Sequence, residues 1–189
     1  MKPNKYWWND GARKHELVFD TVEQISENQN QRPKDNLNHA RLYGNAYFSN
    51  LRGITSAPRN TKNRVTLNII QSMCDTVTAR VAKAKPMATY LTTGGSWAMQ
   101  QKAKLLTKFT EGQFYQADVY KVAPKVFLDA CVFGTGVMKV YEEDSRIKVE
   151  RVFPDEIIVD DLEARYAEPR QMFQQKLVPK DVLVALFPE

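Results

Sequence analysis

Apolar and polar positions alternate with helical spacing over the first half of the chain. Apolar residues recur at steps of three and four in Asp10–Glu27, in Asp35–Phe48 and in Asn63–Lys85, which predicts three helices. Pro33 predicts a break between the first two helices, and Pro86 predicts the end of the third. Asn63 is suited to cap this third helix. Its apolar stripe consists of Thr66, Ile69, Ile70, Met73, Val77, Val81 and Ala84.

The middle of the chain predicts a short strand and two further helices. Met87–Leu91 forms the strand, and Thr92–Gly95 supplies a glycine-containing turn after it. A helix covers Ser96–Ala117 with the serine as its cap, and Asp118 caps the next helix. We expect Met99, Ala103, Leu106 and Phe109 of the first of these helices to face inside. Pro124 fits this last helix only in its first turns, and a kink there is an alternative. One face of the helix consists of Val122, Val126, Phe127, Ala130 and Phe133.

The stretch LDACVFGTGVMKVYEED, residues 128–144, contains a Gly-Thr-Gly sequence that phosphate-binding loops also use. Such loops follow a strand and open a helix, so that backbone amides and the positive helix end face the phosphate. Here the order is helix, glycine, strand, and the carbonyl end of a helix repels phosphate. Gly134 instead fits the left-handed position that ends a helix. The pattern therefore argues against nucleotide binding.

The last third of the chain predicts short antiparallel strands joined by turns. Val137–Tyr141 alternates like a strand, and the charged sequence EEDSR forms the tip of a hairpin. The further predicted elements are the returning strand Ile147–Val152, a turn at Pro154–Asp155, strands at Ile157–Val159 and Arg170–Val178, and a helix at Val182–Phe187.

These elements predict an α+β fold with a helical N-terminal arm. Residues 1–62 form the arm and a basic linker, and residues 63–189 form a helix-rich α+β domain with a small antiparallel sheet. The chain stops directly after a new helix, so we expect this domain to continue beyond the last residue.

The net charge of +5 is concentrated in one short segment, residues 51–64. This segment contains Arg52, Arg59, Lys62 and Arg64 and no acidic residue, among Gly, Pro, Ser, Thr and Asn. Basic side chains on such a linker are available to meet phosphates or an acidic protein. The alternative is a linker that is only solvated. The four side chains are therefore candidate contacts to nucleic acid or to an acidic partner.

Trp7 and Trp8 are unusual in a polar N-terminal segment. Large aromatic side chains are enriched where protein surfaces meet, because they bury much apolar area. We expect the two tryptophans to dock on a protein surface or on a neighbouring subunit, which makes them candidate subunit-interface residues.

The chain offers little for metal binding or redox chemistry. Cys74 and Cys131 lie in apolar helical patterns, which predicts buried free thiols in a reducing compartment rather than a disulfide. His15 and His39 without a Cys-x-x-Cys pair leave no zinc site. Asp160–Asp161 could hold a divalent ion, but no third acid is suitably spaced, and surface termination of a strand is the simpler interpretation.

No pattern predicts catalysis or membrane insertion. No nucleophile has a positioned base, since both histidines lie in the N-terminal arm. We therefore predict no catalytic residue, no metal, no cofactor and no enzyme activity. No apolar run approaches the roughly 18 residues that a membrane span needs.

Four segments follow one another in a distinctive order: NRVTLNIIQSMCDTVTARVAKAKP, DACVFGTGVMKVYEED, IKVERVFPDEIIVDD and EPRQMFQQKLVPKDVLVALFPE. Val152–Asp160 reads Val-x-Pro-x-Glu-Ile-x-Val-Asp, and Pro169–Arg170 stands at the start of the next strand. In order and spacing, residues 63–189 resemble the front part of the portal proteins of tailed bacteriophages. No single segment is specific, and the first 62 residues match only loosely.

The resemblance implies a homo-oligomeric ring, usually of twelve subunits, at one vertex of the capsid. Such a head-to-tail connector is the channel for packaging and ejection of the viral genomic DNA. Its partners are the major capsid protein, the terminase motor and tail adaptor proteins, and it is not itself an enzyme. The present residues would be the N-terminal arm and the outer, wing-like domain of a virion protein that assembles in the host cytoplasm.

Three other interpretations stay open at this stage. Another capsid or tail structural protein would assemble without forming a ring with a central hole. A cellular nucleic-acid-binding module would bind DNA as a monomer with a steep salt dependence. An enzyme with a metal at Asp160–Asp161 would be stabilised by that metal.

Overall fold

The computed structural model describes residues 6–9, 13–45 and 67–187, and its contacts divide the chain into two compact units. The first unit takes the described residues of Met1–Asn36 and Asp155–Glu189, and the second takes those of Leu37–Pro154. Within these residues, seven α-helices accompany two small antiparallel sheets, so the fold is α+β, as predicted. The predicted domain boundary at residues 62 and 63 lies outside the described residues and stays a prediction.

The first two helices meet at a short turn rather than at Pro33. α1 (Lys14–Asn28) ends before the turn, and α2 (Gln31–Tyr43) begins two residues before the proline. Pro33 thus lies in the first turn of α2, where a backbone N–H would have no helical partner. The predicted break between the two helices is confirmed, but it lies at residues 29–30 rather than at Pro33, and α2 ends at Tyr43 rather than at Phe48.

The third helix begins later than the sequence pattern predicts. α3 (Ile69–Ala84) is capped by Asn68, whose side-chain oxygen accepts a hydrogen bond from the Gln71 backbone N–H at 3.0 Å. The predicted cap, Asn63, lies outside the described residues. At the other end Lys85 adopts a left-handed φ of 41°, and Pro86 follows, so the predicted stop is confirmed.

The predicted strand at Met87–Leu91 is wrong, whereas the helix after it is confirmed. These residues pair with no other strand, and the Tyr90 backbone N–H donates instead to the Thr107 hydroxyl at 3.2 Å. An extended segment needs a neighbouring strand to become part of a sheet, and here its neighbour is a helix. That helix, α4 (Trp97–Gln116), has Ser96 at its N-cap position, although the serine side chain makes no capping hydrogen bond.

The fifth helix, α5 (Val119–Phe133), starts at a strained residue. Asp118 occupies the N-cap position with a left-handed φ of 52° and makes no capping hydrogen bond. Its carboxylate forms an ion pair with the Lys121 ammonium at 2.7 Å instead. Pro124 lies inside the helix, beyond its first turn, so the Tyr120 carbonyl lacks the usual backbone donor four residues later.

The Gly-Thr-Gly sequence forms a corner between helix and strand, as predicted. Gly134 ends α5 with a φ of 80°, and its N–H donates to the Ala130 carbonyl at 2.9 Å. β1 (Val137–Glu143) then pairs antiparallel with β2 (Arg146–Val152). The tip residues Asp144 and Ser145 both have positive φ, 52° and 59°, which suits the right-handed twist of a two-residue hairpin.

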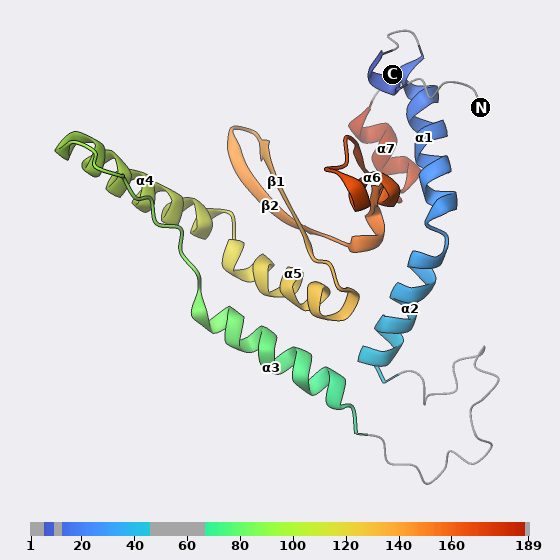
Figure 1. The fold of residues 1–189 in the computed structure, drawn as a ribbon, viewed down its shortest axis with the longest axis horizontal. Coiled ribbons are helices and arrows are strands. Elements are labelled where there is room, and N and C mark those ends of the chain that lie inside the picture. Colours follow the sequence, from blue (N-terminus) through green and yellow to red (C-terminus); the bar gives the residue numbers. More distant parts are fainter. Residues whose placement is uncertain (1–5, 10–12, 46–66, 188–189) are drawn as a thin grey trace. The chain divides into compact units, whose positions relative to one another are not determined.

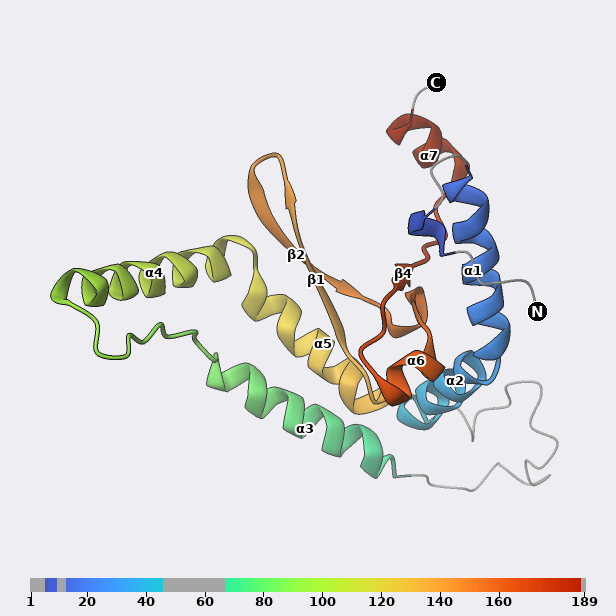
Figure 2. The ribbon, with the colours of Figure 1, turned by 45° about the horizontal axis from the view of Figure 1, so that its top comes forward.

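In the second unit α5 packs against both α3 and the hairpin, as Figures 1 and 2 show. The Asp129 carboxylate is 3% exposed and forms a two-pronged ion pair with the Arg151 guanidinium of β2, with one N–O distance of 2.6 Å. The Phe133 and Phe153 rings meet edge to face at 5.1 Å. These contacts hold the hairpin on the helix.

In the first unit α1 and α2 contact the short strand β3 (Ile157–Val159). The Gln29 side chain donates to the Val159 carbonyl, and the Arg32 guanidinium donates to the Ile157 carbonyl at 3.3 Å. Ile25 and Ile158 are both buried in this unit. Polar side chains of the helical arm thus satisfy backbone carbonyls of the strand.

The end of the first unit has the predicted strand Ile157–Val159, a shorter second strand and one more helix than predicted. β3 pairs antiparallel with β4 (Met172–Gln174), which covers only part of the predicted strand Arg170–Val178. α6 (Asp161–Tyr166) was not predicted, and α7 (Lys180–Leu186) confirms the last helix. β4 is short because its only partner in the described chain, β3, has three residues.

The cysteines are free, as predicted, but they are not buried. Cys74 is half-buried on α3, and Cys131 is exposed on α5. The apolar pattern around them predicted a core position, yet large apolar residues of α3 are exposed in the described part of the chain, and Cys131 lies on an exposed position of α5.

Candidate subunit interface

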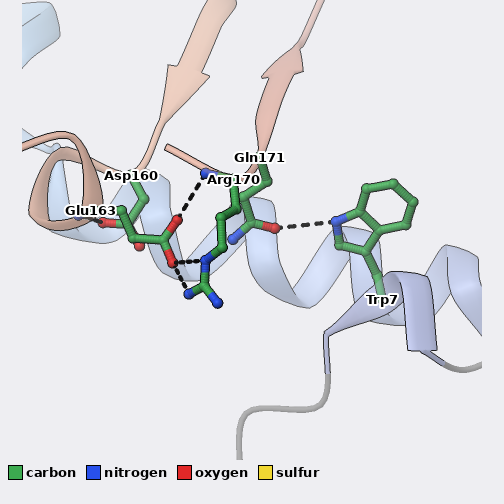
Figure 3. A network of polar contacts seen from close by, with 5 residues as sticks. All are labelled: Trp7, Asp160, Glu163, Arg170 and Gln171. Atoms are coloured by element: carbon green, nitrogen blue, oxygen red, sulfur yellow. Dashed lines mark hydrogen bonds and ion pairs between the residues drawn. The ribbon is translucent and has the colours of Figure 1, made fainter. Parts of the chain in front are cut away.

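The N-terminal aromatic residues form a cluster on the first unit. The Trp7 indole N–H donates to the side-chain oxygen of Gln171 at 3.1 Å, as Figure 3 shows, and its ring lies 6.4 Å from the Phe173 ring. The Trp8 ring stacks on Tyr6 at 4.5 Å and meets Trp7 edge to face at 5.5 Å. Trp7 therefore docks on its own chain, whereas Trp8 packs on Tyr6 and Trp7 and is 38% exposed. The contact of both tryptophans with a neighbouring subunit stays a prediction.

An ion pair next to this cluster joins α6 to Arg170, which lies two residues before β4. The Arg170 guanidinium donates to the Glu163 carboxylate at 3.0 Å and lies 4.6 Å from the centre of the Tyr6 ring. Hydrogen bonds from the Arg170 side chain and backbone hold the pKa of Glu163 below its ordinary value. The N-terminal segment is thus attached to the C-terminal part of the unit by both stacking and charge.

The acidic pair that was a metal-binding alternative belongs to the start of α6. The Asp160 carboxylate accepts a hydrogen bond from the Glu163 backbone N–H at 3.3 Å, and Asp161 is the first residue of the helix. Asp160 therefore acts as a helix cap, the role for which short acidic side chains are preferred. In the part of the chain that the structure describes, no group of three or more His, Cys, Asp or Glu is arranged to hold a metal.

The four basic residues that are candidate contacts to a partner lie outside the part of the chain that the structure describes. Arg52, Arg59, Lys62 and Arg64 all fall in residues 46–66, outside the described residues. Their contact to nucleic acid or to an acidic partner stays a prediction.

One apolar face of α3 is uncovered. The half-buried residues Cys74, Thr78 and Val81 recur at helical spacing on the packed side. The adjacent side is exposed, with Met73 at 64%. The exposed apolar residues of α3 are Ile69, Ile70, Met73 and Val77.

A second apolar face is uncovered on α4. Ala103 is the buried residue of this helix, and Thr107, one turn later, is half-buried. On other sides of the helix, Leu106 and Phe109 are three residues apart and therefore adjacent, and they are 49% and 60% exposed. The exposed apolar residues of α4 are Trp97, Met99, Leu105, Leu106, Phe109 and Tyr115. Contiguous exposed apolar surface marks sites where another protein surface binds.

The sequence pattern placed Met99, Ala103, Leu106 and Phe109 inside, and this prediction is wrong for all of them except Ala103. A signal for an exposed apolar face was nevertheless present. Apolar residues of α4 occur around most of its circumference, which is typical of a helix covered on more than one side. Within the described residues only one side is covered by the chain itself. α4 therefore has an apolar side available to a partner.

The ends of α2 and α3 in the second unit are joined by two hydrogen bonds. The Tyr43 hydroxyl donates to the Asp75 carboxylate at 2.7 Å, and the Asn68 amide donates to the Tyr43 carbonyl at 2.5 Å. The bond to Asp75 raises the pKa of Tyr43 to about 12. The C-terminal end of α2 is thus attached to the N-terminal part of α3.

The hydrogen bond between Tyr43 and Asp75 contributes to the free energy of unfolding, and this contribution depends on pH. We expect Tyr43→Phe to lower the free energy of unfolding by about 1 kcal/mol at neutral pH, since it removes a hydrogen bond to a carboxylate. A tyrosine whose pKa is raised on folding contributes stability below its unfolded pKa, and that stability is lost as the pH rises. The difference between wild type and variant should therefore be constant below pH 10 and shrink towards pH 12. Urea unfolding at several pH values measures it, and a difference that does not change with pH would contradict the assignment.

Comparison of the chain with family models, with curated proteins and with solved structures gave no significant match. Among the described residues, no helix combines the length and the apolarity needed to cross a lipid bilayer.

Proposed function

We propose that this chain is part of a structural protein that functions in a symmetric assembly of identical subunits. Its partner-binding surface consists of the uncovered apolar faces of α3 and α4. More particularly, we propose a subunit of the portal ring of a tailed bacteriophage, located at one capsid vertex. In this role the ring forms the channel for the viral DNA and binds the capsid protein, the terminase motor and the tail adaptor proteins.

The proposal of a symmetric assembly rests on one observation: little of the apolar surface of the described residues is buried. Among the described residues the buried hydrophobic side chains are Ile25, Ala103, Val152 and Ile158. Large apolar side chains of α3 and α4 are exposed instead, several by more than half. A soluble protein rarely leaves such surface in water, because each fully buried large apolar side chain stabilises by about 1.5–3 kcal/mol.

The second step rests on the order of the sequence elements. The helix before Pro86, the corner at Gly134, the hairpin, and the Val152–Asp160 element follow one another as in the portal family. The structure has a helix end, a hairpin and a short strand at these positions, which supports the comparison without deciding it. A closed ring needs a heterologous contact, in which one surface of a subunit binds a different surface of the next.

The test is the assembly state of the full-length gene product. We expect negative-stain images to show rings with a central hole, and gel filtration to give a single large species. The double variant Leu106→Glu/Phe109→Glu should remain folded by circular dichroism but fail to assemble, because two carboxylates would enter an apolar contact. Lys102→Glu is the matched control, since it is exposed on the same helix and changes the net charge equally. It should assemble normally.

Two outcomes would overturn the proposed portal function, and a third would overturn only the proposed role of α4. Assemblies without a central hole would indicate another capsid or tail protein. A monomer at every concentration that binds DNA with a steep salt dependence would indicate a nucleic-acid-binding module. Normal rings from the double variant would retain the portal function but remove α4 from the interface.

A further inference from the structure

The two cysteines of the chain lie on a pair of helices that pack against each other in the second unit. Cys74 is on α3 and Cys131 is on α5. Figures 1 and 2 show the two helices side by side, running in opposite directions. The assembly function proposed above does not involve the thiol group of either cysteine.

The alignment of α3 and α5 places Cys74 and Cys131 at similar positions along the shared axis of the helix pair. The Lys85 ammonium at the end of α3 lies 5.9 Å from the centre of the Tyr120 ring at the start of α5. Cys74 precedes Lys85 by 11 residues, and Cys131 follows Tyr120 by 11 residues. In an antiparallel pair equal steps from a contact lead to residues that face each other. Tyr120 and Cys131 both lie within α5, and because 11 residues make about three full turns they share one side of that helix. Cys74 lies on the packed side of α3 together with Thr78 and Val81.

The distance between such helices is compatible with a disulfide. Packed helix axes are about 8–10 Å apart, and each Cα lies about 2.3 Å from its axis. Facing Cα atoms are then roughly 3–5 Å apart, which overlaps the range of about 4.4–6.8 Å found in disulfides.

Two residues on the packed side of α3 act on the Cys131 thiol. Burial of its thiol raises the pKa of Cys131, and the charge of Cys74 raises it further, while the Thr78 side chain partly offsets the rise. Thr78 is one turn beyond Cys74 on α3, so Cys131 faces two successive positions of one helix side.

We propose that Cys74 and Cys131 form a disulfide within the chain when it meets a low-molecular-weight disulfide such as oxidised glutathione. The thiolate of the more exposed Cys131 attacks one sulfur of the reagent, forms a mixed disulfide and releases one glutathione thiolate. The Cys74 thiolate then attacks the Cys131 sulfur and releases the second glutathione. The protein loses two protons and two electrons, and one oxidised glutathione is reduced to two thiols.

The disulfide joins α3 to α5 and thereby closes a long stretch of chain that includes α4. A crosslink over a long stretch restricts the unfolded chain strongly, so the second unit becomes more stable. The crosslink lies within one subunit and does not depend on the proposed portal function.

The test treats the reduced full chain with oxidised glutathione, blocks the remaining thiols with iodoacetamide, and analyses the product by mass spectrometry. We expect a loss of about 2 Da without any glutathione adduct. Trypsin should release residues 65–80 joined to residues 126–139. The Tm should rise by roughly 5 °C or more, and a thiol reductant should reverse the rise.

Cys74→Ser and Cys131→Ser are the matched controls. Each should retain one glutathione adduct and show no such increase in Tm. A wild-type product with two glutathione adducts, or with disulfides only between chains, would overturn the proposal. Ring assembly measured on the same oxidised sample reports on the proposed function separately.

Discussion

Gly136→Ala is expected to lower the free energy of unfolding by about 3 kcal/mol, among the largest effects of any single methyl group in this chain. A Cβ at this position would lie 2.2 Å from the Val126 carbonyl oxygen and 3.0 Å from a methyl carbon of the same residue. The carbonyl belongs to α5 and cannot move without displacing the helix. The hairpin and α5 would therefore separate at the corner where β1 begins.

Gly134→Ala is the control for this prediction, because it destabilises the protein through backbone strain and not through a steric clash. Gly134 has a left-handed φ of 80°, but no atom lies within 4 Å of a Cβ placed there. Its replacement costs only the backbone strain of a left-handed residue, about 1–2 kcal/mol. Urea unfolding of both variants measures the difference. An equal cost for the two substitutions would contradict the steric argument.

Arg151→Met should destabilise the second unit by about 3 kcal/mol. The substitution leaves the Asp129 carboxylate, which is 3% exposed, without its ion-pair partner. An unpaired buried charge costs about 3–5 kcal/mol, and the lower end applies because the arginine side chain is 42% exposed, so water lies nearby.

A double-mutant cycle identifies the origin of this cost. Asp129→Ala/Arg151→Met removes both charges and should recover part of the stability that Arg151→Met loses. Lys148→Met is the control, since the ion pair of Lys148 with Glu143 is long and exposed and should contribute less than about 1 kcal/mol. If the double variant were less stable than Arg151→Met, a buried charge would not be the cause.

The sequence predicts the elements well where local chemistry decides them. The end of α3 before Pro86, the left-handed Gly134 and the hairpin tip are all set by residues within one or two turns. The strand predicted at Met87–Leu91 failed because a strand depends on a partner that local sequence does not reveal. α6 was missed although Asp160, Asp161 and Glu163 at its start and Arg165 at its end are typical of a helix.

The candidate interface was less predictable because its contacts are distant in sequence. Trp7 was recognised as a docking residue, but its partners Gln171 and Phe173 are more than 160 positions away. The apolar stripe of α3 was identified, yet periodicity alone does not say whether a stripe faces the same chain or another chain. Only the fold shows that Met73 and its neighbours remain uncovered.

The hydrogen bonds that Tyr43 forms with Asn68 and Asp75 have a practical consequence for engineering the chain. A peptide inserted between residues 46 and 66 lengthens a stretch whose two ends are already held together by these residues. The entropic cost of holding two chain positions together grows only with the logarithm of the number of residues between them, by about 0.6 kcal/mol for each doubling. The hydrogen bonds of Tyr43 with Asn68 and Asp75 should therefore persist when an affinity tag or a fluorescent reporter lengthens the chain between the two helices.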